Sequence, residues 1–221
     1  MKNWLKENRG FIIFILCLAF FRTAIADWNP IPSGSMRPTL LEGDVVFVNR
    51  LAYDFKLPLT DMIVAHLADP KRGDIVVFNS PRNGMKLIKR LIALPGDRVE
   101  MRNEVLFING KPAEYSAQQE LMEPLGNGGS IDALRATESI GQNQRRVQFL
   151  SGVSARNTFG PLLVPADSYL MLGDNRDNSA DSRYFGFVPR SLLTGRAQRI
   201  LVSADILGNW HPRTERFGQR L

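Results

Sequence analysis

The stretch Lys71–Asp97, KRGDIVVFNSPRNGMKLIKRLIALPGD, decides the fold class of this chain. Ile75–Phe78 is a short apolar run rich in β-branched residues, which is typical of a buried strand. Ser80–Gly84 has the composition of a turn, and Met85–Leu94 is a second apolar run. In Pro95-Gly96-Asp97 proline precedes glycine, the order that type II turns prefer. The stretch therefore predicts consecutive β-strands joined by tight turns.

The same rhythm continues on both sides of this stretch. Val105–Tyr115 contains Asn109-Gly110 between apolar residues, which is a hairpin signal. Leu51–Asp69 is mixed, so we expect it to be rich in loops. Gln118–Gly152 is polar and only weakly periodic, and we expect part of an insertion with long loops there. Three further segments are predicted to be strands: Gly43–Arg50, Tyr169–Leu172 and Gln198–Ser203.

Composition excludes several kinds of site in this chain of 221 residues. Cys17 is the only cysteine, so neither an intramolecular disulfide nor a zinc site built on cysteine pairs is possible. The two histidines, His66 and His211, are too few for a histidine-rich metal site. The net charge is +6, but the basic residues form no stripe interleaved with aromatic residues, so we expect no nucleic-acid partner. We also expect no metal or other cofactor.

The N-terminal segment has two interpretations. Phe11–Phe21 is apolar and follows basic residues, and Ala24-x-Ala26 has the small residues of a cleavage site, as in a signal peptide. Alternatively, Gly10–Ala26 is a retained anchor near the lower length limit of about 17 residues for a spanning helix. The segment alone slightly favours the signal peptide. In both cases the basic N-terminal side predicts that the rest of the chain lies outside the cytoplasm.

Ile31–Leu40, IPSGSMRPTL, is a candidate nucleophile turn. Two prolines bracket Ser33-Gly34-Ser35, and each proline restricts itself and the residue before it. The expected result is a stiff frame that displays Ser35 with its amide free, while the alternative is an ordinary surface turn. A catalytic Ser35 would begin the active site within a few residues of the apolar run, which favours the anchor over the signal peptide.

A nucleophilic serine needs a base, and a histidine is the first possibility to consider. His66 lies in a segment that we expect to be a loop, and His211 lies in a polar tail after the last predicted strand. A surface or structural role fits both histidines better than a place in a Ser-His-Asp triad.

Lys89 is a second possible base. Side chains alternate along a strand, so Lys89 shares a face with Leu87 and Leu91. On an apolar face its pKa should fall from about 10.4 towards neutrality, and a neutral amine can act as a general base. The alternative is a lysine at a sheet edge whose ammonium reaches solvent. Arg90 stays protonated and cannot be the base, while Lys86, nearer the turn, is a weaker candidate.

Asp174–Arg183 is dense in polar groups. A calcium loop fits poorly, because Arg176 falls where a ligand belongs and the central glycine is missing. A hydrogen-bonded loop fits better, with Asp181 and Arg183 as an ion pair and a hydroxyl of Ser179 or Ser182 against the base. The remaining alternative is an ordinary turn rich in Asp and Asn.

Taken together, four segments in this order resemble the conserved boxes of the bacterial type I signal peptidases. The resemblance covers about 28–98 and 161–203, and a match of four ordered boxes is far more specific than a single motif. The four segments are Pro32–Leu40, Lys71–Phe78, Ile88–Asp97 and Gly173–Gly186.

The resemblance implies roles for individual residues. Ser35 is expected to be the nucleophile and Lys89 the general base, and the Ser35 amide and the Ser33 hydroxyl are expected to form the oxyanion hole. The residues implied to orient the base and brace the site are Ser179, Asp181 and Arg183. The residues implied to line shallow pockets for small substrate side chains are Ile31, Met36, Leu40, Leu87 and Ile88.

The resemblance also implies a mainly β fold, an antiparallel catalytic core with an inserted β-rich subdomain, preceded by one N-terminal transmembrane helix. The implied function is removal of signal peptides from preproteins after Ala-x-Ala. The implied setting is the bacterial inner membrane, with membrane lipid and, indirectly, the export machinery as partners. The implied division is a cytoplasmic tail at 1–9, a transmembrane anchor at 10–27, catalytic core at 28–98, inserted subdomain at 99–164, and the remaining core with a C-terminal tail at 165–221.

Some features depart from the family pattern. One N-terminal apolar segment is present where many Gram-negative relatives have two, Ala93 stands where glycine is usual, and the insertion has no cysteine pair. Two other functions stay open at this point. A self-cleaving, repressor-like Ser-Lys protease would need a DNA-binding region and no anchor. A non-enzymatic β-rich assembly or binding module would carry these segments as structural remnants.

Overall fold

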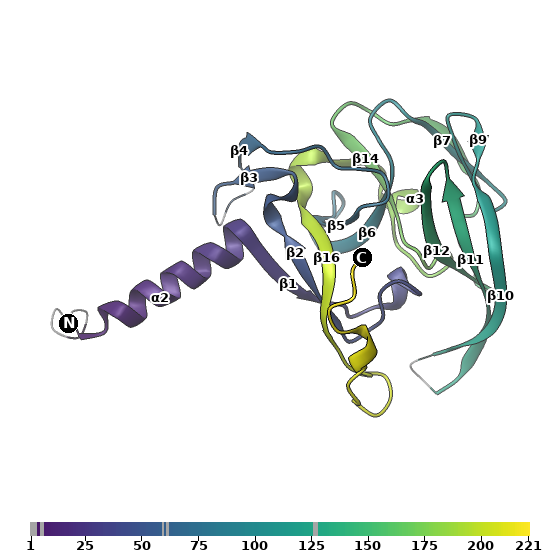
Figure 1. Ribbon diagram of the computed structural model, residues 1–221. Coiled ribbons are helices and arrows are strands. Elements are labelled where there is room, and N and C mark those ends of the chain that lie inside the picture. Colours follow the sequence, from purple (N-terminus) through teal and green to yellow (C-terminus); the bar gives the residue numbers. More distant parts are fainter. Residues whose placement is uncertain (1–3, 5–6, 59, 61, 126–127) are drawn as a thin grey trace.

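The structure is a computed structural model and describes residues 4, 7–58, 60, 62–125 and 128–221. A helical segment projects from a body made almost entirely of antiparallel strands (Figure 1). The predicted mainly β fold is confirmed.

A seven-stranded sheet forms the part of the body next to the helix, in the order β1-β2-β16-β5-β6-β14-β15. β5 and β6 are the two strands of the hairpin predicted around Ser80–Gly84, and they pair Val76 with Lys89 and Phe78 with Leu87. The strands of this sheet are β1 (Ala26–Pro30), β2 (Asp44–Asn49), β5 (Ile75–Asn79), β6 (Lys86–Ala93), β14 (Ser168–Leu172), β15 (Val188–Pro189) and β16 (Leu193–Ser203).

An inserted region of two smaller sheets lies on the far side of the body from the helix (Figure 1). One sheet has the order β13-β7-β8-β9, and the other has the order β10-β11-β12. The strands are β7 (Arg98–Arg102), β8 (Val105–Ile108), β9 (Lys111–Pro112), β10 (Glu114–Pro124), β11 (Ser130–Ile140), β12 (Asn143–Leu150) and β13 (Phe159–Leu163).

The expectation of long loops over Gln118–Gly152 was therefore wrong, because most of this segment is a meander of long strands. Most residues of β10 are exposed on both faces of the strand, so apolar residues do not alternate regularly there. The loop-rich segment Leu51–Asp69 likewise contains a small hairpin, β3 (Asp54–Lys56) with β4 (Ile63–His66).

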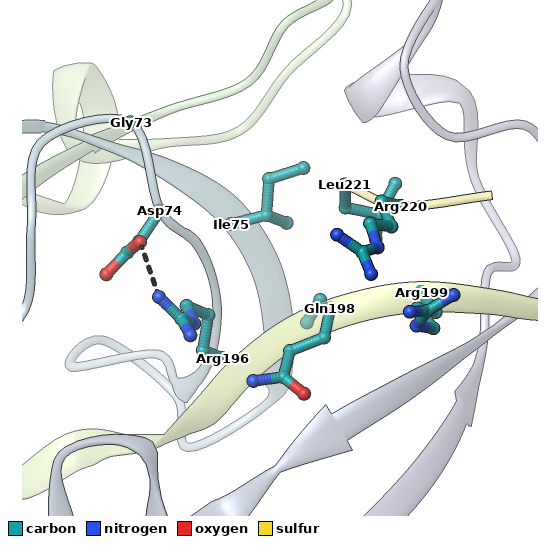
Figure 2. A pocket seen from close by; sticks show the side chains of 9 residues that line it. Gly73, Asp74, Ile75, Arg196, Gln198, Arg199, Arg220 and Leu221 are labelled. Carbon is teal, nitrogen blue, oxygen red and sulfur yellow. Dashed lines mark hydrogen bonds and ion pairs between the residues drawn. The ribbon is translucent and has the colours of Figure 1, made fainter. Parts of the chain in front are cut away.

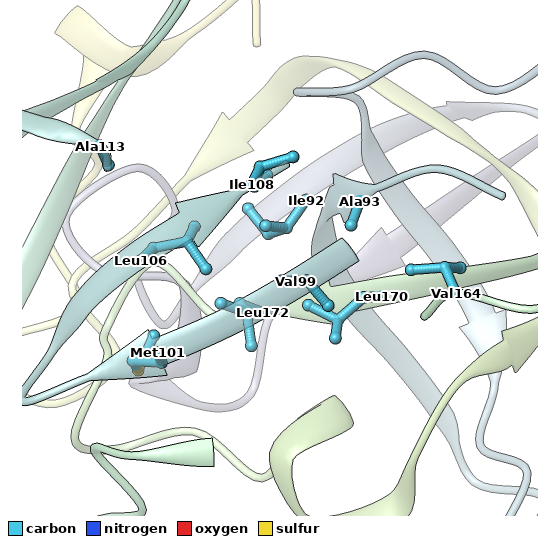
Figure 3. Close-up of a cluster of buried hydrophobic side chains, with 10 residues drawn as sticks. All are labelled: Ile92, Ala93, Val99, Met101, Leu106, Ile108, Ala113, Val164, Leu170 and Leu172. Carbon is cyan, nitrogen blue, oxygen red and sulfur yellow. The ribbon is translucent and has the colours of Figure 1, made fainter. Parts of the chain in front are cut away.

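The insertion and the central sheet share a continuous apolar core. Figure 3 shows buried side chains from β6 and β14 packed against side chains from β7 and β8. This packing fixes the insertion relative to the strand that carries Lys89. The cluster consists of Ile92, Ala93, Val99, Met101, Leu106, Ile108, Ala113, Val164, Leu170 and Leu172.

The helical segment comprises α2 (Arg9–Phe20) and a π-helical turn, Phe21–Ile25. Ala26 and Asp27, which the sequence grouped with the anchor, begin β1 instead, because they pair with the end of β2. Among the residues that the structure describes, no helix reaches the 18 residues of sufficient apolarity that define a candidate membrane span. The other short helical turns are Gly34–Met36, Arg50–Ala52, α3 (Ser182–Phe185), Arg190–Leu192 and Thr214–Arg216.

The junction between helix and sheet is held by Asp27. Its carboxylate accepts a 3.0 Å hydrogen bond from Nε of Arg22, and Nζ of Lys86 on β6 lies 3.4 Å from it. The guanidinium of Arg22 stacks over the ring of Trp28, 4.5 Å from its centroid. One buried carboxylate thus ties the end of the helical segment to both β1 and β6.

Candidate active site

Ser35 is the middle residue of the helical turn Gly34–Met36, and it is half-buried. The loop after β14 holds this turn: Nδ2 of Asn175 donates to the Gly34 carbonyl at 3.0 Å, and the Asn175 backbone N–H donates to the Ser35 carbonyl at 3.1 Å. Gly173 lies so close to the turn that a Cβ there would be 2.5 Å from the Ser35 carbonyl oxygen. The candidate nucleophile turn and the polar loop Asp174–Arg183 are therefore packed as one unit.

The side chain of Lys89 ends at Ser35. Its Nζ donates a hydrogen bond of 2.7 Å to the Ser35 hydroxyl and one of 3.0 Å to the Ile88 carbonyl. Lys89 is 3% exposed, and this burial disfavours the charged amine and lowers the pKa of Lys89 from 10.5 to about 8. A substantial fraction of the amine is neutral near that pH, so the pair suits proton transfer from a hydroxyl to an amine.

Two carboxylates, Asp181 and Asp174, act against this shift, because negative charge nearby favours the protonated amine. Each carboxylate is already occupied by an arginine. Asp181 accepts two hydrogen bonds of 2.8 Å from Arg183, and Asp174 accepts bonds of 2.8 and 2.6 Å from Arg90. Neither carboxylate contacts the Lys89 amine directly through a hydrogen bond in the described residues, so desolvation remains the dominant effect.

The predicted ion pair of Asp181 and Arg183 is present and fully buried. Asp181 also accepts a 3.0 Å hydrogen bond from the backbone N–H of Gly173, so it braces the loop that packs on Ser35. Ser33 precedes the helical turn in an extended conformation and is exposed. Ser179 is buried, but its hydroxyl has no hydrogen-bond partner within the described part of the chain, including Lys89.

The five predicted substrate-lining residues fall into two groups. Ile31, Met36 and Leu40 belong to a buried core cluster beneath the turn and are at most 2% exposed, so they do not present a surface to a substrate in this structure. Leu87 and Ile88 are half-buried on β6, beside Lys89. Only these two have the partial exposure that a pocket wall requires.

The two histidines lie apart from this arrangement. Nδ1 of His66 lies 2.7 Å from Asp54, which is also paired with Arg190, and His211 is exposed in the C-terminal tail. Among the described residues, no group of three or more His, Cys, Asp or Glu could hold a metal ion.

Sequence reasoning missed Asn175 and the pairing of Arg90 with Asp174. Asn175 carries the turn through backbone and amide hydrogen bonds, which leave no periodic signal. Arg90 gave a partial signal, since a charged residue between Ile88 and Ile92 needs a buried partner. Nothing in the sequence indicated which carboxylate would supply it.

A separate hollow of about 360 Å³ lies between β5, β16 and the C-terminal tail (Figure 2). Arg196, Arg199 and Arg220 line it together with Asp74, and Arg196 lies 3.5 Å from Asp74. It includes neither Ser35 nor Lys89, so it is not part of the candidate active site.

Comparison with known proteins gives one consistent result. The family model described as signal peptidase, peptidase S26 matches residues 1–202. A signal peptidase I of Buchnera aphidicola subsp. Schizaphis graminum is 33% identical, over 94% of this chain and 77% of the relative. A signal peptidase I of Pseudomonas aeruginosa is 36% identical, over 90% and 72%. The crystal structure of a signal peptidase I from Enterococcus faecalis is 33% identical with a TM-score of 0.34, over 59% of this chain and 97% of that one.

Proposed function

This chain belongs to the signal peptidase family S26, and we propose that Ser35 and Lys89 are the catalytic dyad with which it works. The activity follows from membership of the family. The chain is a type I signal peptidase, an endopeptidase that removes signal peptides from preproteins. The observation that supports the dyad is the 2.7 Å contact between the buried Lys89 amine and the Ser35 hydroxyl.

In the proposed mechanism, the hydroxyl oxygen of Ser35 attacks the carbonyl carbon of the scissile bond while its proton passes to the neutral amine of Lys89. The resulting ammonium returns that proton to the nitrogen of the leaving peptide, and the carbon–nitrogen bond breaks. A water then loses a proton to Lys89 and attacks the acyl-enzyme ester. Collapse of the second intermediate releases Ser35, which takes the proton back.

The negative oxygen of each tetrahedral intermediate needs hydrogen-bond donors. We assign this role to the Ser35 amide and the Ser33 hydroxyl, and the exposed position of Ser33 next to the turn is compatible with it. Removing one such donor in other acyl-transfer enzymes costs about 3 kcal/mol of transition-state stabilisation. Ser33→Ala should therefore lower kcat by about 100-fold.

We propose that Leu87 and Ile88 contact the small side chains that precede the scissile bond. The support for this proposal is that both residues are partly exposed and adjoin Lys89 along β6, Leu87 on the face of Lys89 and Ile88 on the other face. A shallow wall of this kind fits alanine better than a large side chain, which agrees with cleavage after Ala-x-Ala.

We further propose that the helical segment is a membrane anchor. Arg9–Ile25 continues without a break from α-helix into the π-helical turn. The α-helix alone would span about 18 Å at 1.5 Å per residue, and the π-helical turn lengthens it towards the roughly 30 Å hydrocarbon core. Its large apolar side chains are exposed, including Phe11, Phe14 and Leu16. Anchoring in the bacterial inner membrane, with the N-terminus cytoplasmic, would bring the enzyme to substrates that the export machinery delivers.

The dyad is tested with the purified full chain in detergent and a preprotein that carries an Ala-x-Ala site. Ser35→Ala and Lys89→Met should each abolish cleavage while circular dichroism and thermal unfolding show a folded protein. Full activity of either variant would refute the proposal. N-terminal sequencing of the mature protein separates the anchor from a cleaved signal peptide.

A further inference from the structure

Arg37 lies two residues after Ser35 and connects the nucleophile turn with the inserted region. Its Nε donates to a carboxylate oxygen of Glu42 at 2.8 Å, within the segment that follows the turn. Its Nη1 donates to Glu123 and, at 3.3 Å, to the Pro124 carbonyl, both at the end of β10. The arginine is 8% exposed, so this contact lies inside the protein.

Glu123 is held from its own side as well. It is 3% exposed, and its second carboxylate oxygen accepts a 2.6 Å hydrogen bond from Arg135 on β11. Arg135 in turn donates to the side chain of Gln148 on β12 at 2.9 Å. A continuous series of hydrogen bonds therefore runs from all three strands of the inserted sheet to the residue that follows Met36.

The ion pair lies against the nucleophile turn at Gly34. A Cβ at Gly34 would lie 2.8 Å from Oε1 of Glu42 and 3.2 Å from Nε of Arg37. The Gly34 peptide is thus enclosed by this ion pair on one side, while Asn175 binds its carbonyl oxygen. A shift of Arg37 would reach the backbone that displays Ser35, because the Arg37 backbone N–H also donates to the Gly34 carbonyl at 3.1 Å.

The energetics point the same way. A buried ion pair gains little net stability over a well-packed apolar pair of the same size, because both charges lose their hydration. What three fixed carboxylate and guanidinium groups do supply is geometry, since the planar fork of an arginine allows few orientations between two carboxylates. The site of this constraint, two residues from Ser35, is where orientation affects the reaction most strongly.

We propose that Glu123 is a positioning residue for Ser35, acting through Arg37, so that the inserted sheet completes the nucleophile turn. The inference rests on the proposed catalytic role of Ser35. It assigns the inserted sheet a part in the reaction, although none of its residues is proposed to touch the substrate.

The experiment compares steady-state cleavage of a preprotein-derived peptide by the full chain in detergent. Glu123→Gln keeps the shape of the side chain and removes its charge, and kcat is expected to fall about 10- to 100-fold while KM changes less than about twofold. Arg37→Met should lose at least as much. The double variant should be no slower than Arg37→Met alone, because both changes remove the same connection. Glu100→Gln, which removes an exposed ion pair with Arg102 in the insertion, is the matched control and should keep wild-type kcat.

A kcat of Glu123→Gln within twofold of wild type, or losses that multiply in the double variant, would overturn the positioning role. If Glu123→Gln is recovered unfolded, Arg37→Lys decides instead: it keeps the charge but cannot bridge both carboxylates, and wild-type kcat in that variant would also overturn the role. Ser35→Ala is measured in parallel. Full cleavage activity in that variant would refute the dyad, whereas an inactive Ser35→Ala beside an unaffected Glu123→Gln would refute the positioning role alone.

Discussion

The side chain of Asn175 donates a hydrogen bond of 3.0 Å to the carbonyl oxygen of Gly34, across 141 positions of sequence. The backbone of the same residue binds the next carbonyl, that of Ser35. One residue of the loop after β14 thus orients two consecutive peptide groups of the nucleophile turn. Changes in that loop should therefore alter the reaction without touching either member of the dyad.

The first prediction concerns the pH dependence of cleavage. The pKa of Lys89 is about 8, and only the neutral amine can accept the Ser35 proton. The value of kcat/KM should rise about tenfold per pH unit below pH 8 and level off above it. The measurement is peptide cleavage by the wild-type protein between pH 5.5 and 9.5, at a fixed ionic strength. A profile that is flat across this range would contradict a lysine base.

The second prediction concerns the stability cost of the base. Below pH 8 the folded protein holds a buried ammonium at Lys89. Between pH 8 and about 10.5 it has lost the Lys89 proton, which the unfolded chain still keeps, and in both ranges this lowers the free energy of unfolding. Lys89→Met should therefore raise the free energy of unfolding at pH 7, by up to about 3 kcal/mol. The gain should shrink as the pH rises from 8 to 10.5. Urea unfolding at pH 7 and pH 10 measures it, and a Lys89→Met protein less stable than wild type at pH 7 would speak against the buried, uncharged lysine.

The third prediction concerns Asp181. Its charge raises the pKa of Lys89, so Asp181→Asn should move the acidic limb of the pH profile to lower pH. The same change leaves Arg183 without its buried partner and should destabilise the fold by about 3–5 kcal/mol. The pH profile is measured by peptide cleavage and the free energy of unfolding by urea denaturation, both at a temperature well below thermal unfolding. Glu100→Gln serves as a control that removes a carboxylate paired with the exposed Arg102, and it should move neither the pH profile nor the free energy of unfolding.

The fourth prediction concerns the close approach of Gly173. A methyl group there would meet the Ser35 carbonyl at 2.5 Å and the Ser179 hydroxyl at 2.3 Å. Gly173→Ala should push the loop away from the turn, at a cost of about 1–3 kcal/mol, and lower kcat about 100-fold. Gly10→Ala, where no atom lies within 4 Å of the added methyl group, should keep full activity. Equal activity of the two variants would show that the loop yields without moving Ser35.

The fifth prediction concerns acid stability of the insertion. Burial would raise the pKa of Glu138, but Arg176 and Arg145 outweigh it and lower the pKa to about 2. This contribution to stability is complete above about pH 4.5 and is lost as the pH falls towards 2. Glu138→Gln should cost about 3–5 kcal/mol at pH 7, and much less at pH 2.5. Urea unfolding of the wild type and of Glu138→Gln, at pH 7 and at pH 2.5, measures this cost. A difference in the free energy of unfolding that is as large at pH 2.5 as at pH 7 would contradict the lowered pKa of Glu138.

The strands nearest the dyad could be predicted because their side chains alternate against a core. Lys89 followed from the same pattern, since leucines flank it on its face of β6. The strand β10 could not be predicted, because it is exposed on both faces and buries only Glu123. Strand pairing there depends on neighbours that a short window of sequence does not contain.

The buried ion pairs are the second feature that could be predicted from the sequence only in part. The sequence predicted the pair of Asp181 and Arg183 because the two residues are close along the chain. It could not predict that Arg176 pairs with Glu138 or that Arg37 pairs with Glu123, because these partners lie 38 and 86 positions apart in sequence. Ser179 shows the opposite case: a role carried over with the family was expected, but its hydroxyl has no hydrogen-bond partner in the described residues.

The junction at Asp27 has a consequence for the position at which a substrate is cut. The π-helical turn ends at Ile25 and β1 begins at Ala26, with Asp27 clamped to Arg22 and Lys86. No slack therefore separates the proposed anchor from the strand that leads to Ser35. With the proposed anchor in the membrane, the Ser35–Lys89 dyad would lie at one fixed height above the lipid surface. A preprotein would then be cut at a bond whose distance from its own hydrophobic segment matches that height.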